Sequence, residues 1–282
     1  MKDSLTCLLL HLADNALVLG HRNSEWTGHG PILEQDIAIS NIALDLVGHA
    51  RNFYQATADL INQQAALPIR NSSAYTQEEG SCVPFLPNYI AGDTGMVTED
   101  TLAYLRNANQ YLNLLMMEQP RGDWALTTLR QFLVSAYQLV YFHHLLSHKA
   151  PEVKAIAEKS LKEIYYHFTW SGEWVIRLGD GTSESHSRLV KALKILWPYT
   201  GEFFEAEWFE TAEGLDTMGM EAAWQKQVID IFDKATLLNE FSGISAEGKK
   251  LTGGKRGIHG KELESMLEEM QVLQRTYPGC EW

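Results

Sequence analysis

Cysteine is scarce in this chain of 282 residues. The three cysteines, Cys7, Cys82 and Cys280, lie far apart and form neither a CxxC pair nor a zinc-ligand spacing. An odd number of scattered cysteines is typical of a protein from a reducing compartment. We therefore expect no structural disulfide and no structural zinc site.

Basic residues and long apolar runs are also limited. The chain has 23 lysines and arginines against 36 acidic residues, which gives a net charge of -13. Nucleic acid and anionic membranes are poor partners for such a surface. No apolar run approaches the roughly 18 residues that a membrane span needs. We therefore expect a cytoplasmic protein that binds neither nucleic acid nor a membrane.

Strand-like alternation of apolar and polar residues is missing, as are internal repeats. The sequence contains no GxSxG, no P-loop and no GxGxxG after a strand, so hydrolase, NTPase and dinucleotide-binding functions have no support. It does contain apolar residues at helical spacing over long stretches, and its hydrophobic content of 45% allows a large core. These features predict an all-α protein.

The length of the apolar stretches is typical of a four-helix bundle, here with additional C-terminal helices in one domain over residues 1–282. Residues 67–97 are rich in proline, glycine and small polar residues, and predict a loop insertion between bundle halves, as in ferritin-like bundles. The predicted bundle helices span about 4–22, 31–65, 123–148 and 151–178. Other predicted helices span about 98–118 and, within a C-terminal extension at 183–282, about 184–197, 220–237 and 261–275, with a loop at 239–260.

A histidine lies on the inward stripe of the second predicted helix. Ile42, Leu46, His49 and Phe53 recur at steps of four, three and four, so they share one face of a helix that turns about 100° per residue. His167 has a similar position on the fourth bundle helix. Histidines on the buried faces of two long helices are what a di-metal site in a four-helix bundle would present.

The carboxylates that such a site requires do not accompany the histidines. A di-iron bundle takes a Glu-x-x-His pair from each of two helices, because this spacing points the carboxylate and the imidazole at the same ions. None of the ten histidines has an acidic residue three positions before it. Leu46 and Ile164 occupy these positions before His49 and His167. We therefore expect both histidines to be structural core residues.

A simpler metal site is the alternative interpretation. Asp45 and His49 are four residues apart, as are Glu163 and His167, so the members of each pair lie about 40° apart around their helix. One metal ion held by both pairs would make the chain a carboxylate-poor metal-binding enzyme. Against this alternative, apolar residues fill the positions where further acids would stand.

The predicted loop at 239–260 is unusually basic for this acidic chain. Lys255 and Arg256 lie in the run Gly253-Gly254-Lys255-Arg256-Gly257, which is not a Walker sequence. Its cations and flexible glycines suit a phosphate or an acidic partner. A solvated turn is the alternative.

Short motifs spread over the chain occur together in one known family. They are Asp14–Leu19, Ser24–Trp26, Gly28–His29, Asn41–Phe53, Met117–Pro120, Lys162–Glu163, Tyr166–His167, Arg177–Thr182, Thr252–Gly257, Glu269–Gln271, Leu273–Arg275 and Trp282. With these motifs the chain resembles the PaaC family, the structural subunits of the phenylacetyl-CoA oxygenase (1,2-epoxidase) complex. The resemblance spans essentially the whole chain, is weakest over 67–97, and is highly specific as a set.

The resemblance implies a ferritin-like bundle that pairs with PaaA, the homologous catalytic subunit that carries the di-iron site and binds the CoA thioester. It also implies a hetero-oligomeric complex with a reductase in aerobic phenylacetate degradation, in which this subunit is structural and holds no cofactor. The positions that match the ligands of the catalytic subunit are Asn15 or Ala16, Leu46, His49, Ser135, Ile164 and His167. Both histidines are therefore kept, and every acid is lost.

Overall fold

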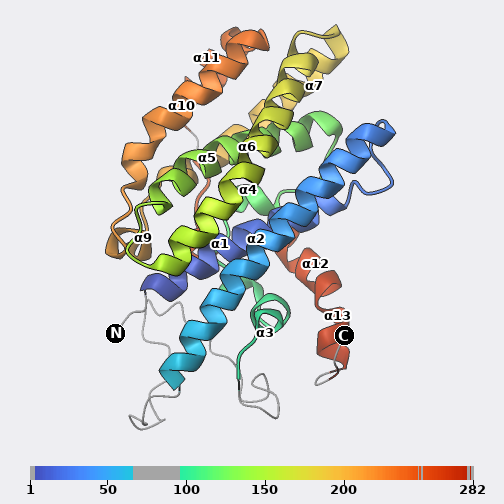
Figure 1. Cartoon of the computed structure of the whole chain (residues 1–282). Coiled ribbons are helices and arrows are strands. Elements are labelled where there is room, and N and C mark those ends of the chain that lie inside the picture. Colours follow the sequence, from blue (N-terminus) through green and yellow to red (C-terminus); the bar gives the residue numbers. More distant parts are fainter. Residues whose placement is uncertain (1–3, 66–95, 247, 249, 278–279, 281–282) are drawn as a thin grey trace.

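The computed structural model describes residues 4–65, 96–246, 248, 250–277 and 280 of the chain. Within these residues all regular structure is helical, which confirms the predicted all-α class (Figure 1). The architecture is a ferritin-like four-helix bundle with additional C-terminal helices. α1 packs along α2, α5 packs along α6, and α2 also contacts α6. The four bundle helices are α1 (Ser4–Ser24), α2 (Leu33–Ala65), α5 (Trp124–Leu145) and α6 (Pro151–Gly179).

Local chemistry sets where these helices begin and end. The Asp123 side chain accepts a hydrogen bond from the backbone N–H of Leu126 at 3.0 Å, and so caps the start of α5. Pro151 begins α6, where its missing N–H is not needed. Gly179 ends α6, and a Cβ added there would lie 2.2 Å from the backbone oxygen of Ala235. Only glycine therefore allows this contact.

α1 is almost entirely buried. It is long and apolar enough to cross a membrane, yet 83% of its most apolar stretch is buried inside the bundle. A helix that is buried on most sides is apolar on most sides, so its composition reflects its place in the core. Several polar side chains are nevertheless buried in it, and the contacts of His11, Asp14 and Asn15 are described below.

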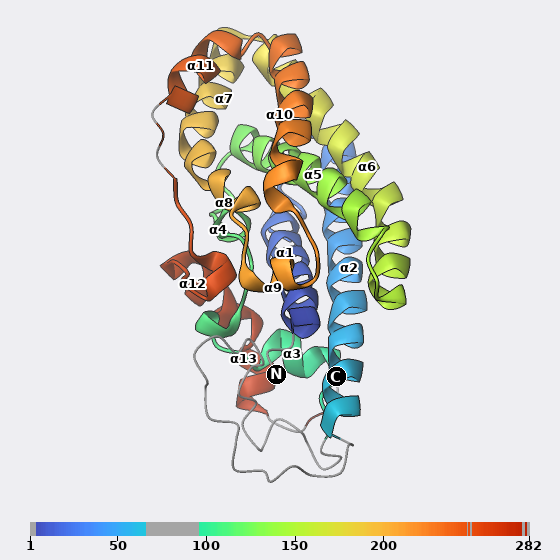
Figure 2. The same ribbon diagram turned by 90° about the vertical axis from the view of Figure 1, so that its left-hand side faces the viewer.

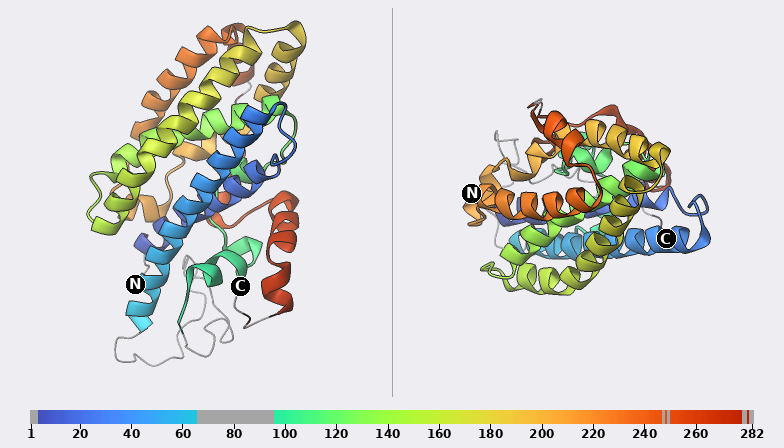
Figure 3. Two further views of the ribbon diagram at one scale, coloured as in Figure 1. Left: turned by 45° about the vertical axis from the view of Figure 1, so that its right-hand side comes forward. Right: turned by 90° about the horizontal axis from the view of Figure 1, so that it is seen from above.

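The C-terminal helices cover two different parts of the bundle (Figures 2 and 3). α7 (Ser183–Leu196) and α10 (Thr217–Lys234) pack on α5 and α6, and α11 (Leu238–Ala246) joins them. α12 (Lys261–Met270) and α13 (Val272–Thr276) lie at the other end of the molecule. Between α7 and α10 the chain also forms α8 (Gly201–Phe204) and α9 (Trp208–Ala212).

Residues 98–118 do not form the single helix that the sequence predicts. The backbone N–H groups of Leu112 and Leu114 instead donate to the side chains of Asp14 and Asn15, at 2.8 Å in both cases. These donors would otherwise have served the helix itself, so buried polar groups of α1 hold the segment in a non-helical path. The segment divides into α3 (Glu99–Tyr104), η1 (Ala108–Gln110) and α4 (Leu115–Glu118).

Two other boundaries differ from the prediction. The loop expected at 239–260 begins with α11 and contains η3 (Gly254–Arg256). The helix expected at 261–275 is divided into α12 and α13 at Gln271, whose side chain donates to the backbone oxygen of Arg106 at 2.9 Å. The loop predicted at 67–97 lies almost wholly outside the described residues.

The expectation of no disulfide is wrong, because Cys7 is disulfide-bonded. Cysteines that are far apart in a sequence can meet in a fold, and spacing along the chain does not reveal such a pair.

Candidate functional site

His49 of α2 and His167 of α6 lie where these two helices contact each other. Both imidazoles are buried, as the apolar stripes predict, and their ring centroids are 6.3 Å apart. The family resemblance matches them to the two positions where a di-iron bundle would place its imidazole ligands. The region between α2 and α6 is therefore the candidate metal centre.

Each histidine is bonded to a carboxylate of the opposite helix. His49 Nε2 lies 2.6 Å from Glu163 Oε2, and His167 Nε2 lies 3.0 Å from Asp45 Oδ2. Because a carboxylate only accepts hydrogen bonds, Nε2 carries the proton in both rings. The four residues of the alternative metal site are thus brought together, but as two crossed hydrogen bonds that join α2 to α6.

The positions of the carboxylates argue against one shared metal ion. The side chains of Asp45 and Glu163 are 32% and 39% exposed, whereas those of His49 and His167 are almost fully buried. The acids therefore lie at the rim of the bundle while the imidazoles lie inside it. Within the described part of the chain, no group of three or more His, Cys, Asp or Glu side chains is arranged to hold a metal ion.

Burial controls the charge of His49. Loss of solvent lowers the pKa of His49, and the hydrogen bond to Glu163, which raises it, does not make up the difference. The imidazole is therefore neutral near pH 7. Its Nδ1, like that of His167, is buried and has no hydrogen-bond partner among the described residues.

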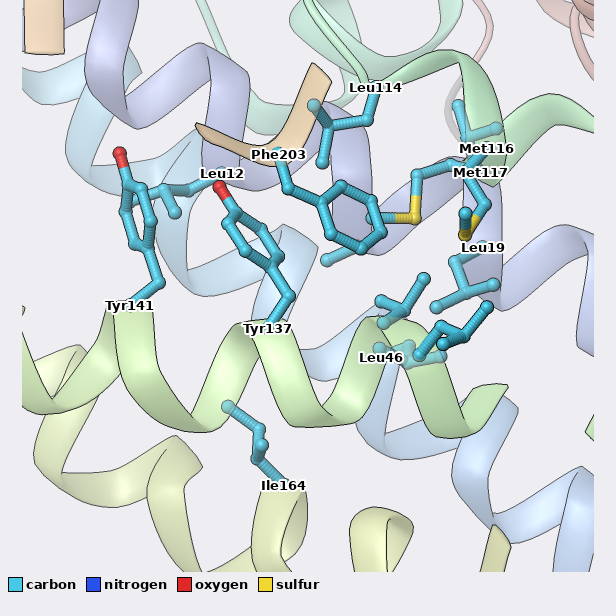
Figure 4. Packing of buried hydrophobic residues seen from close by; sticks show 14 of the residues in the cluster. Leu12, Leu19, Leu46, Leu114, Met116, Met117, Tyr137, Tyr141, Ile164 and Phe203 are labelled. Atoms are coloured by element: carbon cyan, nitrogen blue, oxygen red, sulfur yellow. The ribbon is translucent and has the colours of Figure 1, made fainter. Parts of the chain in front are cut away.

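The remaining ligand positions offer no carboxylate. Leu46 and Ile164 are fully buried and fill the interior with methyl groups (Figure 4). Ala16 is also buried, and Ser135 accepts a hydrogen bond from the Gln131 side chain at 2.9 Å. Two imidazoles whose nearest carboxylates lie at the rim do not fit a di-iron site, because iron that activates oxygen needs carboxylate ligands beside the imidazoles. That this chain holds no metal remains a prediction.

Asn15, which matches the first ligand position, belongs to a separate buried network with His11. His11 Nδ1 donates to the backbone oxygen of Leu112 at 2.7 Å, and Asn15 Nδ2 donates to His11 Nε2 at 3.1 Å. Burial lowers the pKa of His11 to about 4. This histidine is therefore a neutral residue of the core and not a ligand. It was not among the site residues predicted from the sequence.

A second buried centre, which was not predicted from the sequence, surrounds Asp14. Arg106 Nη1 donates to Asp14 Oδ2 at 3.1 Å, and the Nη2 of the same guanidinium donates to Oδ1. The hydroxyl of Tyr54 and the backbone N–H of Leu112 also donate to this carboxylate, at 2.5 and 2.8 Å. Burial disfavours the Arg106 cation, but Asp14 outweighs it and raises the pKa of Arg106. The sequence signal for this buried centre was Asp14 itself, an acid within the apolar stretch that forms α1.

Residues 252–260 are tied to α4 and α8 by buried carboxylates. The backbone N–H groups of Gly253 and Gly254 donate to Glu202 at 2.8 and 2.6 Å. His259 donates to Glu118 from Nδ1 at 2.8 Å and to the backbone oxygen of Tyr111 from Nε2 at 2.9 Å. With two acceptors, His259 carries both protons, and although burial disfavours this charge, Glu118 raises the pKa of His259.

Lys255 and Arg256 make their contacts within the chain. Lys255 is buried, and its ammonium lies 2.9 Å from Glu210. Arg256 is about half exposed and pairs with Glu205 and Glu207, at 2.9 and 2.8 Å. Lys255 therefore has a structural role here, contrary to a role on an open binding surface. Partner or phosphate binding by this segment stays a prediction that depends on Arg256.

These features define a class, a ferritin-like helical bundle that keeps two buried histidines but lacks the carboxylates of a di-iron site. The chain belongs to the phenylacetic acid catabolic protein family, whose family model matches residues 1–282. It is 38% identical over 285 residues to one of the subunits of the 1,2-phenylacetyl-CoA epoxidase of Escherichia coli (strain K12). The match covers 99% of this chain and 100% of that relative.

Proposed function

We propose that this chain is the non-catalytic structural subunit of a multicomponent phenylacetyl-CoA monooxygenase, a ring 1,2-epoxidase of aerobic phenylacetate degradation. The observation that carries the proposal is the apolar filling of the ligand positions by Leu46 and Ile164, beside two histidines that bond to rim carboxylates. The relative supports the proposal, because that protein is a named subunit of a 1,2-phenylacetyl-CoA epoxidase.

The proposal assigns the chemistry to a homologous partner of the PaaA type. That partner would hold the di-iron site, and a reductase would deliver electrons to it. This chain would contribute no cofactor and would act in the cytoplasm as part of the hetero-oligomer. A bundle without a metal site still offers the shape that a second bundle of the same family can pack against.

Co-expression tests the pairing. We expect the untagged chain to co-elute with a tagged PaaA-like subunit in size-exclusion chromatography. We also expect the purified pair, supplied with reductase and phenylacetyl-CoA, to consume oxygen, and this chain alone to be inactive. Failure to co-elute, or oxygen-dependent turnover by this chain alone, would contradict the proposal.

A further inference from the structure

α2 is apolar on two opposite sides. Its inner face carries Leu46 and His49 and is buried, but a second set of residues on the same helix faces solvent. This outer stripe occupies about 100° of arc opposite the inner face, at about 100° per residue. A helix that is apolar on most sides is normally buried on most sides. The outer stripe consists of Leu33, Ile37, Leu44, Val47 and Gly48, and two polar residues, Ser40 and Arg51, lie within the same arc.

Two members of the outer stripe stand out. Leu33 and Leu44 are 71% and 68% exposed, which is unusual for leucines in a long helix. Gly48 has no atom within 4 Å of the place where a Cβ would lie, so the chain itself does not require glycine there. Glycine in an exposed helix interior is less stable than alanine. It does permit the backbone of another molecule to approach closely.

A cavity of about 220 Å³ opens at the end of the outer stripe, between α1, α2 and α3. Leu17, Ala50 and Ala103 line it with apolar surface. Arg51 and Glu99 also line it and form an ion pair, with Nε and Oε1 3.5 Å apart. An apolar hollow with polar residues beside it suits one large side chain of a protein partner.

The edge of α2 next to the outer stripe is negative. Asp45 lies on that edge and Glu163 on the neighbouring helix α6; each is about one third exposed and accepts its hydrogen bond from a buried histidine. Among the described residues, neither acid pairs with a lysine or an arginine. A partner that covers this face should therefore bring a cation. A second copy of this acidic chain would place the same carboxylates against each other in a two-fold contact.

We propose that the outer stripe and the cavity of α2 dock one long helix of the di-iron catalytic subunit. This inference depends on the proposed function, which supplies that subunit. From Leu33 to Arg51 the surface is about 27 Å long, which matches a bundle helix. The docked helix presents apolar side chains to the outer stripe, places a large apolar side chain in the cavity, and brings a lysine or arginine next to Asp45 and Glu163.

Leu44→Glu tests the surface against the matched control Met218→Glu. Both residues are exposed, at 68% and 72%, and Met218 lies on α10, far along the chain from the outer stripe. Each variant is co-expressed with the tagged catalytic subunit, and the affinity of the purified pair is measured. We expect Leu44→Glu to weaken binding by roughly tenfold or more, because a central apolar contact is lost. Met218→Glu should bind like wild type.

The outcomes separate the two proposals. If wild type does not bind the catalytic subunit, the proposed function and the docking surface both fail. If wild type binds and Leu44→Glu binds equally well, only the docking surface is overturned. A Leu44→Glu change that dissociates a dimer of this chain, without affecting the heteromer, would assign the surface to a second copy and also overturn the inference. Circular dichroism should show that both variants are folded.

Discussion

Two buried regions of this bundle treat carboxylates in opposite ways. Where α1 meets the irregular segment around Leu112, Asp14 is fully buried and accepts hydrogen bonds from Arg106 and Tyr54. Where α2 meets α6, Leu46 and Ile164 fill the interior and the acids stay at the rim. A buried acid is thus kept where the chain supplies its donors, and is missing where a metal ion would have been needed.

The C-terminal extension follows the first of these patterns. Glu202 is buried against the backbone N–H groups of Gly253 and Gly254, and Glu210 is buried against Lys255. The bundle has therefore kept buried charges that hold its segments together. The following predictions test that contrast, from the largest expected effect to the smallest.

Arg106→Ala should lower the free energy of unfolding by about 3–5 kcal/mol, because it leaves Asp14 buried without its cation. Urea unfolding measures this change. The matched control is Arg188→Ala, since Arg188 pairs with Glu184 and Asp123 at the surface, and it should have no measurable effect. Equal effects of the two changes would remove the distinction between buried and surface ion pairs.

Leu46→Glu should lower the free energy of unfolding by about 3–4 kcal/mol, because it buries a carboxylate that has no donor. Leu44→Glu, two residues away on the exposed side of α2, should change it by less than about 0.5 kcal/mol. The comparison uses the same substitution in the same helix. A stable, metal-free Leu46→Glu protein would show that this interior can satisfy an acid after all.

His11 should make the fold sensitive to acid. Its pKa falls from 6.5 to about 4 on burial, so between these values the unfolded chain binds a proton that the folded chain does not. Unfolding is then favoured as the pH drops. Through His11, the free energy of unfolding should fall by roughly 3 kcal/mol between about pH 6.5 and 4. Comparing denaturant unfolding of wild type and His11→Gln over this range measures it. If the free energy of unfolding of His11→Gln falls with pH as steeply as that of wild type, His11 is not the source of the acid sensitivity.

His49→Ala should lower the free energy of unfolding by about 1–3 kcal/mol, since it removes buried volume and the bond to Glu163. The assembled oxygenase should keep its turnover, because the residue is structural in this account. Unfolding and oxygen consumption are measured on the same preparation. A complex that assembles normally but no longer turns over would give His49 a role in the reaction.

Arg256→Ala should lower the free energy of unfolding by less than about 1 kcal/mol, because its pairs with Glu205 and Glu207 are partly solvent-exposed. Its neighbour Lys255 provides the contrast, since Lys255→Ala leaves Glu210 buried without a cation and should cost several times more. Thermal unfolding of the two variants makes the comparison. A larger decrease in melting temperature for Arg256→Ala than for Lys255→Ala would contradict this prediction.

The four long helices could be predicted from the sequence because apolar spacing, Asp123 and Pro151 act locally. The burial of His49, His167, Leu46 and Ile164 followed from the same spacing. That each histidine bonds to the acid of the other helix could not be predicted, since the spacing of four residues favoured pairs within one helix. The way in which two helices meet decides such contacts.

The irregular segment between α3 and α4 escaped prediction for a similar reason. Its backbone bonds to Asp14 and Asn15, which lie about a hundred residues earlier. The role of Lys255 was also hidden, because a basic run with glycines resembles an exposed turn until Glu210 is placed beside its ammonium. Long-range polar contacts, and not local propensity, fix these parts.

Iron analysis of the purified complex beside the purified, untagged chain tests the central claim most directly. The account predicts stoichiometric iron in the complex that follows the amount of the catalytic subunit, and no stoichiometric iron in this chain alone. Two iron ions per molecule of this chain, bound in the absence of the partner, would contradict it.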